Sequence, residues 1–191
     1  MQLINRDELR RNMLSRRRSM TDQEVNNLSR RICSRLERLY PVTKANVIMG
    51  YNSINNEVNL IPWLVELKRQ GRTIVLPRVQ GGQLQAVEVN DWNNMAPGPF
   101  GIKEPLGDPI AIEKIDVVLV PGIVFDAKGY RLGYGKGYYD LFLPGLSKQC
   151  FNCGVCYEYQ VIDNVFPHKK DVAVHWIVTD QSEIAIDMNY F

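Results

Sequence analysis

Residues 115–122 read Ile-Asp-Val-Val-Leu-Val-Pro-Gly and contain the most apolar run of the chain, which ends at a Pro-Gly turn signal. A short, almost continuously apolar segment is typical of a strand buried on both faces, as in the middle of a parallel sheet. In α/β proteins such strands deliver a loop at their carboxyl end, where ligands bind. The loop that follows Gly122 is therefore the first candidate for a functional site.

Other short apolar or alternating segments predict further strands on both sides of this one. They lie at residues 45–51, 73–76, 84–89, 151–157 and 172–179, and the last of these is expected to be the final strand. The segment 90–109 is rich in Pro, Gly and Asn, so we expect it to be mostly loop.

Helices are predicted before and between the strands. Asn5 and Thr21 each have the spacing of an N-cap followed three residues later by a carboxylate, and apolar residues then recur at helical intervals, as far as Leu39 in the second segment. Two further helices are expected at 59–70 and 137–143.

Strands that alternate with helices predict the fold class α/β. We expect a single-domain three-layer α/β/α sandwich with a mostly parallel or mixed central sheet. This domain would span residues 1–191, with residues 1–40 as a helical segment packed on it.

The composition is that of an ordinary folded protein, since 45% of the residues are hydrophobic and 23% are charged. Residues 1–18 contain no apolar run suited to a secretory signal, and no stretch approaches the roughly 20 apolar residues that span a bilayer. We therefore expect a cytoplasmic protein with reduced thiols and no membrane partner. A monomer is the expected state.

The overall charge of +2 is unevenly distributed. Residues 1–40 carry ten Lys and Arg against five Asp and Glu, a local charge of +5. Such a segment can contact an anion, a nucleotide or a nucleic acid, although a solvated helix face is the simpler interpretation. We expect Arg16–Arg18 to form a solvated face of this kind, without a functional role.

Residues 131–140 read Arg-Leu-Gly-Tyr-Gly-Lys-Gly-Tyr-Tyr-Asp. Glycines let backbone N–H groups surround an anion, and the start of a following helix adds positive potential. Lys136 would neutralise a terminal phosphoryl group, Arg131 would hold another phosphate, and Asp140 would hold Mg²⁺. The segment is not a Walker A loop, because no Ser or Thr follows the Gly-Lys pair. From these residues alone, a sharp structural turn explains the glycines about as well.

The same segment, preceded by Val120-Pro-Gly122 and Phe125-Asp126, resembles the signature of the 5-formyltetrahydrofolate cyclo-ligase family, also called 5,10-methenyltetrahydrofolate synthetases. Weaker similarity covers nearly the whole chain, including the turn at 101–105. The resemblance implies an enzyme that uses ATP and Mg²⁺ to convert 5-formyltetrahydrofolate into 5,10-methenyltetrahydrofolate, releasing ADP and phosphate. In this reaction the formyl oxygen attacks the γ-phosphate, N10 closes the ring, and phosphate leaves.

The resemblance also implies roles for individual positions. ATP would be bound by Arg6, Arg10, Arg131, Leu132, Gly133, Tyr134, Gly135, Lys136, Gly137, Tyr138 and Tyr139. The folate would be bound by Asn52, Glu57, Phe100, Tyr134, Gly135, Lys136, Gly137 and Tyr138, and the metal by Asp140 and Asp171. Lys136 is the expected catalytic residue, because phosphoryl transfer is catalysed mainly by positioning and charge.

Two of these positions carry a further expectation. Arg6 stands where the family has a lysine, and both side chains can engage phosphate. A carboxylate at Glu57 is suited to the donor-rich edge of a pterin ring.

Two alternatives remain open at this point. The first is a non-catalytic folate-binding or RNA-binding relative, supported by the basic segment at the N-terminus. Nucleic acid is disfavoured, because the total charge is nearly neutral and basic residues do not alternate with aromatic ones. The second is an ATP-dependent enzyme of the same fold that acts on another small amide-like substrate.

The cysteines and histidines are expected to be structural. Cys150, Cys153 and Cys156 have the spacing of metal ligands, but positions three apart on a strand point to opposite faces. We expect buried or half-buried thiols there. His175 is expected to be a hydrogen-bonded strand residue.

Overall fold

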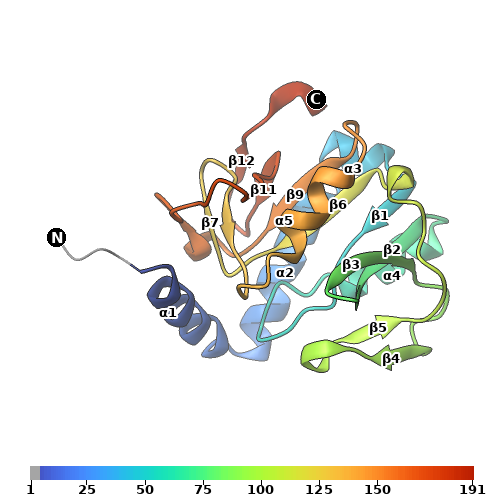
Figure 1. Cartoon of the computed structure of the whole chain (residues 1–191), viewed down its shortest axis with the longest axis horizontal. Helices are drawn as coiled ribbons and strands as arrows, with labels where there is room; N and C mark the ends of the chain where they lie inside the picture. The colour runs from blue at the N-terminus through green and yellow to red at the C-terminus, as the bar shows by residue number, and fades with distance from the viewer. Residues whose placement is uncertain (1–4) are drawn as a thin grey trace.

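The computed structural model describes residues 5–191, with the side chain of Phe100 left undescribed. Its main feature is a seven-stranded sheet with the strand order β12-β11-β9-β6-β1-β2-β3 (Figure 1). The strands are β1 (Val47–Met49), β2 (Thr73–Gln80), β3 (Gln83–Glu88), β6 (Val117–Pro121), β9 (Phe151–Val155), β11 (Trp176–Val178) and β12 (Glu183–Ala185). The apolar run expected to be a central strand is β6, which occupies the middle of the sheet.

The inner strands of this sheet are parallel. β6 pairs in parallel with β1, where Ile48 faces Val117, and with β9, where Leu119 faces Cys153. The four β6 residues 117–120 are fully buried, as expected for a strand covered on both faces. β3 and β12 pair antiparallel at the two edges. The prediction of an α/β fold with a mostly parallel or mixed sheet is confirmed.

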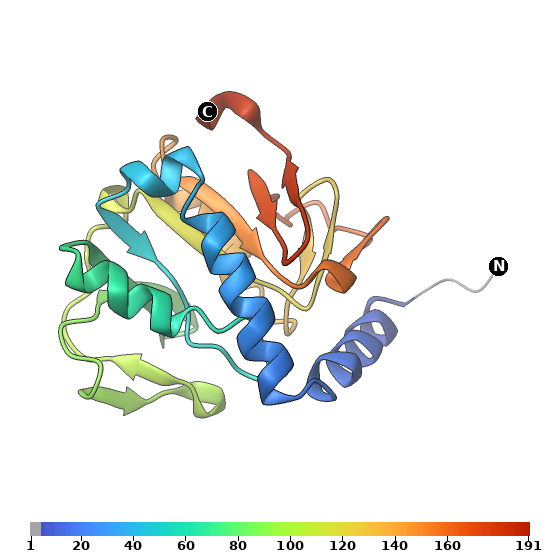
Figure 2. The ribbon, with the colours of Figure 1, turned by 180° about the vertical axis from the view of Figure 1, so that it is seen from behind.

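One face of the sheet is covered by α2 (Asp22–Leu36), α3 (Tyr40–Lys44) and α4 (Ile61–Arg69), as seen in Figure 2. Thr21 begins α2 with the expected capping box, in which its hydroxyl accepts from the Glu24 amide. The second predicted helix does not reach Leu39. It ends at Leu36, and Pro41 lies in the first turn of the separate helix α3, where a missing N–H costs nothing.

The other face of the sheet is not covered by a full layer of helices. It carries α5 (Tyr138–Phe142), which has five residues, and a small sheet of strand order β10-β7-β8. The strands of this small sheet are β7 (Val124–Asp126), β8 (Arg131–Leu132) and β10 (Val161–Ile162). α1 (Arg6–Arg18) packs Leu9 and Met13 against this region.

Several elements were not expected from the sequence. β12 follows β11, so the expectation that the strand at 172–179 is the last one is wrong. The segment 90–109, expected to be mostly loop, contains a hairpin of β4 (Met95–Pro97) and β5 (Lys103–Pro105). Strands of two or three residues are too short to show a period of alternation. The 3-10 helices are η1 (Pro99–Gly101), η2 (Ile112–Lys114), η3 (Leu143–Gly145), η4 (Glu158–Gln160) and η5 (Met188–Tyr190).

The cysteines lie as expected, whereas His175 is hydrogen-bonded but precedes the strand β11 (Trp176–Val178) rather than lying in it. All four cysteines are free and buried, and burial raises the pKa of the Cys33 and Cys150 thiols to about 12. His175 Nδ1 accepts a hydrogen bond from the Asn152 amide (3.1 Å). None of the helices within residues 5–191 has the length and apolar character needed to cross a membrane.

The Phe125 ring fixes β7 against the large sheet, because two glycines leave room for it. A Cβ atom on Gly154 would lie 2.6 Å from Phe125 Cε1, and one on Gly122 would lie 2.4 Å from Cε2. The ring therefore cannot move away from one glycine without meeting the other.

We predict that Gly154→Ala lowers the free energy of unfolding by about 1–3 kcal/mol, through overpacking. Urea denaturation measures the effect. In a Phe125→Leu background the same substitution should cost clearly less, because the smaller side chain can yield. Equal costs in both backgrounds would contradict the proposed contact.

Candidate active site

A cleft of about 1130 Å³ opens at the carboxyl ends of β1 and β6. Tyr51 and Asn52 follow β1 into it, and Pro121 and Gly122 follow β6. The cleft thus lies where the apolar run at 115–122 predicted a functional loop. The amino-terminal half of α1 and the hairpin β4–β5 contribute to its walls.

Most of the residues expected to bind ATP, folate or metal line this one cleft. They are Arg6, Arg10, Asn52, Glu57, Arg131, Gly133, Tyr134, Gly135, Lys136, Gly137, Tyr138, Tyr139, Asp140 and Asp171. Leu132 does not line it, because its side chain is fully buried among the residues that contact α1. The side chain of Phe100 lies outside the described part of the structure.

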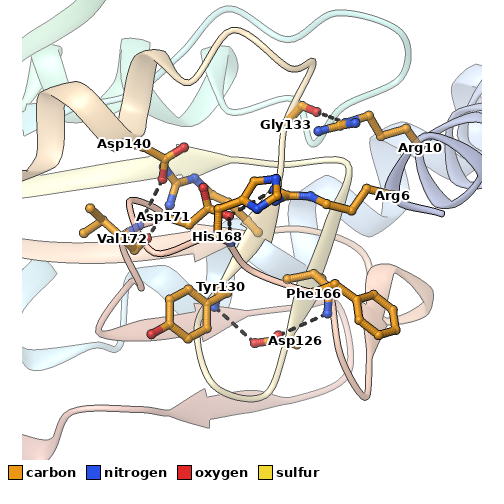
Figure 3. A network of polar contacts seen from close by, with 12 residues as sticks. Arg6, Arg10, Asp126, Tyr130, Gly133, Asp140, Phe166, His168, Asp171 and Val172 are labelled. Atoms are coloured by element: carbon orange, nitrogen blue, oxygen red, sulfur yellow. Dashed lines mark hydrogen bonds and ion pairs between the residues drawn. The ribbon is translucent and has the colours of Figure 1, made fainter. Parts of the chain in front are cut away.

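Two arginines of α1 reach the glycine loop, which is residues 133–137, and the residues beside it (Figure 3). Arg10 Nε donates to the carbonyl of Gly133 (2.9 Å), and so fixes the start of the loop. Arg6 Nη2 donates to Asp171 Oδ2 (3.0 Å). Arg6 Nε and Nη1 are buried without a hydrogen-bond partner among residues 5–191, which leaves two donors for a ligand.

The glycine loop has the left-handed backbone conformation that its glycines allow. Gly135 and Gly137 have φ angles of 92° and 67°, in the left-handed region that side chains other than glycine disfavour. Lys136 between them is exposed, and it takes part in no ion pair within residues 5–191. The loop therefore presents backbone amides and one cation at the surface of the cleft.

Arg131 is buried behind the loop rather than exposed to a ligand. Its Nη1 donates to the carbonyl of Val172 (2.6 Å), and its Nη2 donates to Asp140 Oδ1 (3.0 Å). Burial lowers the pKa of Arg131, and the charge of Asp140 opposes this effect. The guanidinium thus aligns Asp140, and its role as a direct phosphate ligand stays a prediction.

The two expected metal ligands lie in the same network, and each is partly engaged. Asp140 Oδ1 also accepts from the Val172 amide (3.1 Å), while Asp171 Oδ2 accepts from Arg6 and from the His168 amide (2.8 Å). The other oxygen of each carboxylate has no hydrogen bond among the described residues. Mg²⁺ is commonly held by one or two carboxylates together with substrate phosphates and water, so this donor set fits the ion. Residues 5–191 contain no group of three His, Cys, Asp or Glu side chains suited to a metal.

Glu57 lies deeper in the cleft, and its carboxylate is held from three sides. Its Oε2 accepts from the Ile54 amide (3.0 Å), and its Oε1 accepts from the hydroxyl of Tyr134 (3.3 Å) and from Arg17 Nη2 (3.5 Å). Burial raises the pKa of Glu57, whereas the positive charge of Arg17 opposes that rise.

Comparison with known proteins agrees with this geometry. The 5-formyltetrahydrofolate cyclo-ligase family matches residues 3–180. The chain belongs to this family.

Similarity to individual cyclo-ligases extends over most of the chain. A 5-formyltetrahydrofolate cyclo-ligase of Escherichia coli K12 is 24% identical over 171 residues, which cover 86% of this chain and 94% of that protein. One from Mycoplasma pneumoniae is 28% identical over 180 residues, covering 93% and 100%. The solved structure of 5,10-methenyltetrahydrofolate synthetase from Aquifex aeolicus has a TM-score of 0.85 at 32% identity, covering 96% of this chain and 93% of that one.

Arg17 is the main feature of this cyclo-ligase family member that sequence reasoning misjudged. Expected to be part of a solvated face, it is only 1% exposed. Besides Glu57, it donates to the carbonyls of Asn55 (2.8 Å) and Gly122 (3.1 Å) and to the hydroxyl of Tyr134 (2.6 Å). The sequence did contain an indication that Arg17 faces the same way as Arg6 and Arg10, namely the spacing of the three residues. Arginines at 6, 10 and 17 project within about 40° of one another around a helix.

One tyrosine of the cleft, Tyr51, was also missed, whereas Tyr139 was expected to bind ATP. The hydroxyls of Tyr51 and Tyr139 are buried and have no hydrogen-bond partner among the described residues. Together with the two nitrogens of Arg6, they form a group of unpaired polar atoms in one cleft. Unpaired buried groups cost free energy, so their concentration here indicates a ligand.

We predict that Arg17→Met destabilises the protein by about 3–5 kcal/mol, because it leaves Glu57 buried without its cation. Denaturant unfolding measures the loss. Adding Glu57→Gln should recover a part of it, since the neutral side chain does not need the charge.

The matched control is Arg11→Met, which removes an exposed arginine from the same helix. It should change stability by less than about 0.5 kcal/mol. Equal effects of the two substitutions would show that the buried ion pair contributes little.

Proposed function

We propose that this protein converts 5-formyltetrahydrofolate into 5,10-methenyltetrahydrofolate at the expense of ATP. One observation carries the proposal: the glycine loop, the α1 arginines, two acids and the unpaired tyrosine hydroxyls meet in a single cleft. The members of its family are named for this reaction.

The phosphates of ATP would lie over the glycine loop. Backbone amides of residues 133–137 and the ammonium group of Lys136 supply the positive charge there. Arg6 adds its two unpaired nitrogens from the side of α1. Since α5 has only five residues, the loop and these side chains carry most of the attraction.

Asp140 and Asp171 would hold Mg²⁺ through the oxygens that their arginine partners leave free. When bound, the ion would neutralise part of the phosphate charge. Arg131 and Arg6 orient the two carboxylates, which limits their freedom to turn away.

The folate would occupy the deeper part of the cleft, next to Glu57 and Asn52. A formyl carbon attached to nitrogen is a poor electrophile, because the nitrogen lone pair is shared with it. Transfer of the γ-phosphoryl group to the formyl oxygen creates a leaving group. N10 then bonds to the formyl carbon and loses its proton, and the carbon–oxygen bond breaks to release phosphate.

Phosphoryl transfer of this kind needs water to be excluded and the reacting oxygen to be held in line. The cleft walls around the glycine loop, together with the ring of Tyr139, would serve that purpose.

The direct test is turnover by the purified protein. With Mg-ATP, 5-formyltetrahydrofolate should disappear, while 5,10-methenyltetrahydrofolate, measured by its absorbance, and ADP should form in equal amounts. ATP loss without methenyl formation would show ATP hydrolysis that is not coupled to ring closure, and would also count against the proposal. Absence of both changes would overturn the proposal.

We predict that Lys136→Ala reduces kcat by about 100- to 1000-fold with the fold intact, because one preorganised cation is lost from the transferring phosphoryl group. Steady-state kinetics and circular dichroism measure the two effects. The control Lys148→Ala removes an exposed lysine outside the cleft and should leave kcat unchanged. Wild-type turnover by Lys136→Ala would remove this residue from the catalytic role.

We predict that Asp140→Asn raises the Mg²⁺ concentration needed for half-maximal turnover by about tenfold or more, because amide oxygen binds Mg²⁺ more weakly than carboxylate. Asn keeps an acceptor for Arg131 and Val172 but removes the negative charge beside the buried Arg131, so Tm is measured together with the titration. The control Asp163→Asn changes an exposed acid and should leave the Mg²⁺ titration as it is. A titration unaltered by Asp140→Asn would speak against metal ligation.

A further inference from the structure

One carboxylate of the cleft differs from all the others. Five acidic side chains line the cleft, and four of them form ion pairs with arginine. The pairs are Asp7 with Arg10, Glu57 with Arg17, Asp140 with Arg131 and Asp171 with Arg6. The fifth, Glu104, has no cationic partner within residues 5–191.

Glu104 is nevertheless held firmly. It lies on β5 and is 9% exposed, and its Oε1 accepts from the Val79 amide of β2 (3.0 Å). Gly98 lies against its other side, where an added Cβ would be 2.3 Å from Glu104 Cδ. The carboxylate is therefore fixed between the hairpin and the large sheet. Its Oε2 has no hydrogen bond among the described residues.

The surroundings of Glu104 favour a hydrogen bond from a ligand to its carboxylate. The adjacent lining of the cleft is apolar and includes Pro77, Val79, Pro99 and Ile102. Hydrogen bonds strengthen in such surroundings. Glu104 Oε2 is not among the buried unpaired polar atoms of the described residues, so it is open to a ligand in the cleft. A ligand with two parallel N–H donors would meet this carboxylate as arginine does, with charge assistance.

The geometry points to Glu104 as the group that binds the amino-pyrimidinone edge of the pterin ring, through its exocyclic amino group and the neighbouring ring N–H. This inference rests on the proposed function. It transfers to Glu104 the contact that the sequence suggested for Glu57. Both oxygens of Glu57 already accept from Arg17, Tyr134 and the Ile54 amide.

The position of Glu104 suits this role. Asn52 Nδ2 donates to the carbonyl of Lys103 (2.5 Å), the residue before Glu104. This bond ties β5 to the loop that carries Glu57. A pterin bound to Glu104 would thus extend toward Glu57 and the glycine loop, where the phosphoryl group is transferred.

The first test is Glu104→Gln, measured by calorimetric titration of the full-length protein with 5-formyltetrahydrofolate. Gln keeps an acceptor for the Val79 amide, so the hydrogen bond to β2 should persist and Tm should stay unchanged. The Kd for the folate should rise about 10- to 100-fold, as expected for loss of a hydrogen bond to a charged group. The Kd of Glu104→Gln for a non-hydrolysable ATP analogue should not change. The control Glu113→Gln replaces an exposed acid outside the cleft and should leave the Kd for the folate unchanged.

A folate analogue without the exocyclic amino group tests the contact from the ligand side. Wild-type protein should bind this analogue about 10-fold or more weakly than 5-formyltetrahydrofolate, whereas Glu104→Gln should discriminate much less between the two. Equal discrimination by both proteins would overturn the assignment, as would an unchanged Kd in Glu104→Gln. If wild-type protein binds no folate at all, the proposed function falls with it.

Gly98→Ala provides an independent variant. Gly98 has a φ angle of −104°, which alanine adopts without strain, so the main effect is to displace Glu104. Folate binding should weaken as in Glu104→Gln, and the two substitutions together should not weaken it further. Undiminished folate binding by Gly98→Ala with Glu104 displaced would contradict the inference.

Discussion

The structure depends on one buried guanidinium. Arg17 joins α1 to three segments that are distant in the sequence: the loop that carries Glu57, the turn after β6 at Gly122, and the glycine loop at Tyr134. A buried cation is tolerated only when its donors are satisfied, and here all of its nitrogens find acceptors. The position of α1, and with it of the other arginines of that helix, follows from this requirement.

This constraint gives the cleft its distribution of charge. Four acids are paired with arginines. Among the described residues that line the cleft, this leaves Lys136, Arg18 and part of Arg6 as cations available to a ligand, and Glu104 as the one acid without a cationic partner. An anionic ligand group is therefore favoured at the glycine loop, and a donor-rich group at the hairpin β4–β5. ATP and a pterin have these complementary properties.

The basic charge near the N-terminus had an RNA-binding interpretation, and three of its ten arginines contribute little to it. Arg6, Arg10 and Arg17 turn toward the cleft or the interior, where each contacts the protein itself. Helical spacing shows that they share a face, but it does not reveal what that face meets. The same limit applies to Arg131: the sequence did not reveal that its guanidinium aligns Asp140, and its expected contact with phosphate stays a prediction.

The sequence by itself determined the features that depend on neighbouring residues: the central strand β6, the capped helices α1 and α2, the left-handed glycines of the loop and the family signature at 131–140. The three-dimensional fold decided which charges are buried and paired, and it formed the short strands β4, β5, β7, β8 and β10. Arg17 and Glu57 are 40 residues apart, and Arg6 and Asp171 are 165 apart. Periodicity and capping act over one or two helical turns, whereas burial of a charge depends on which distant segments meet.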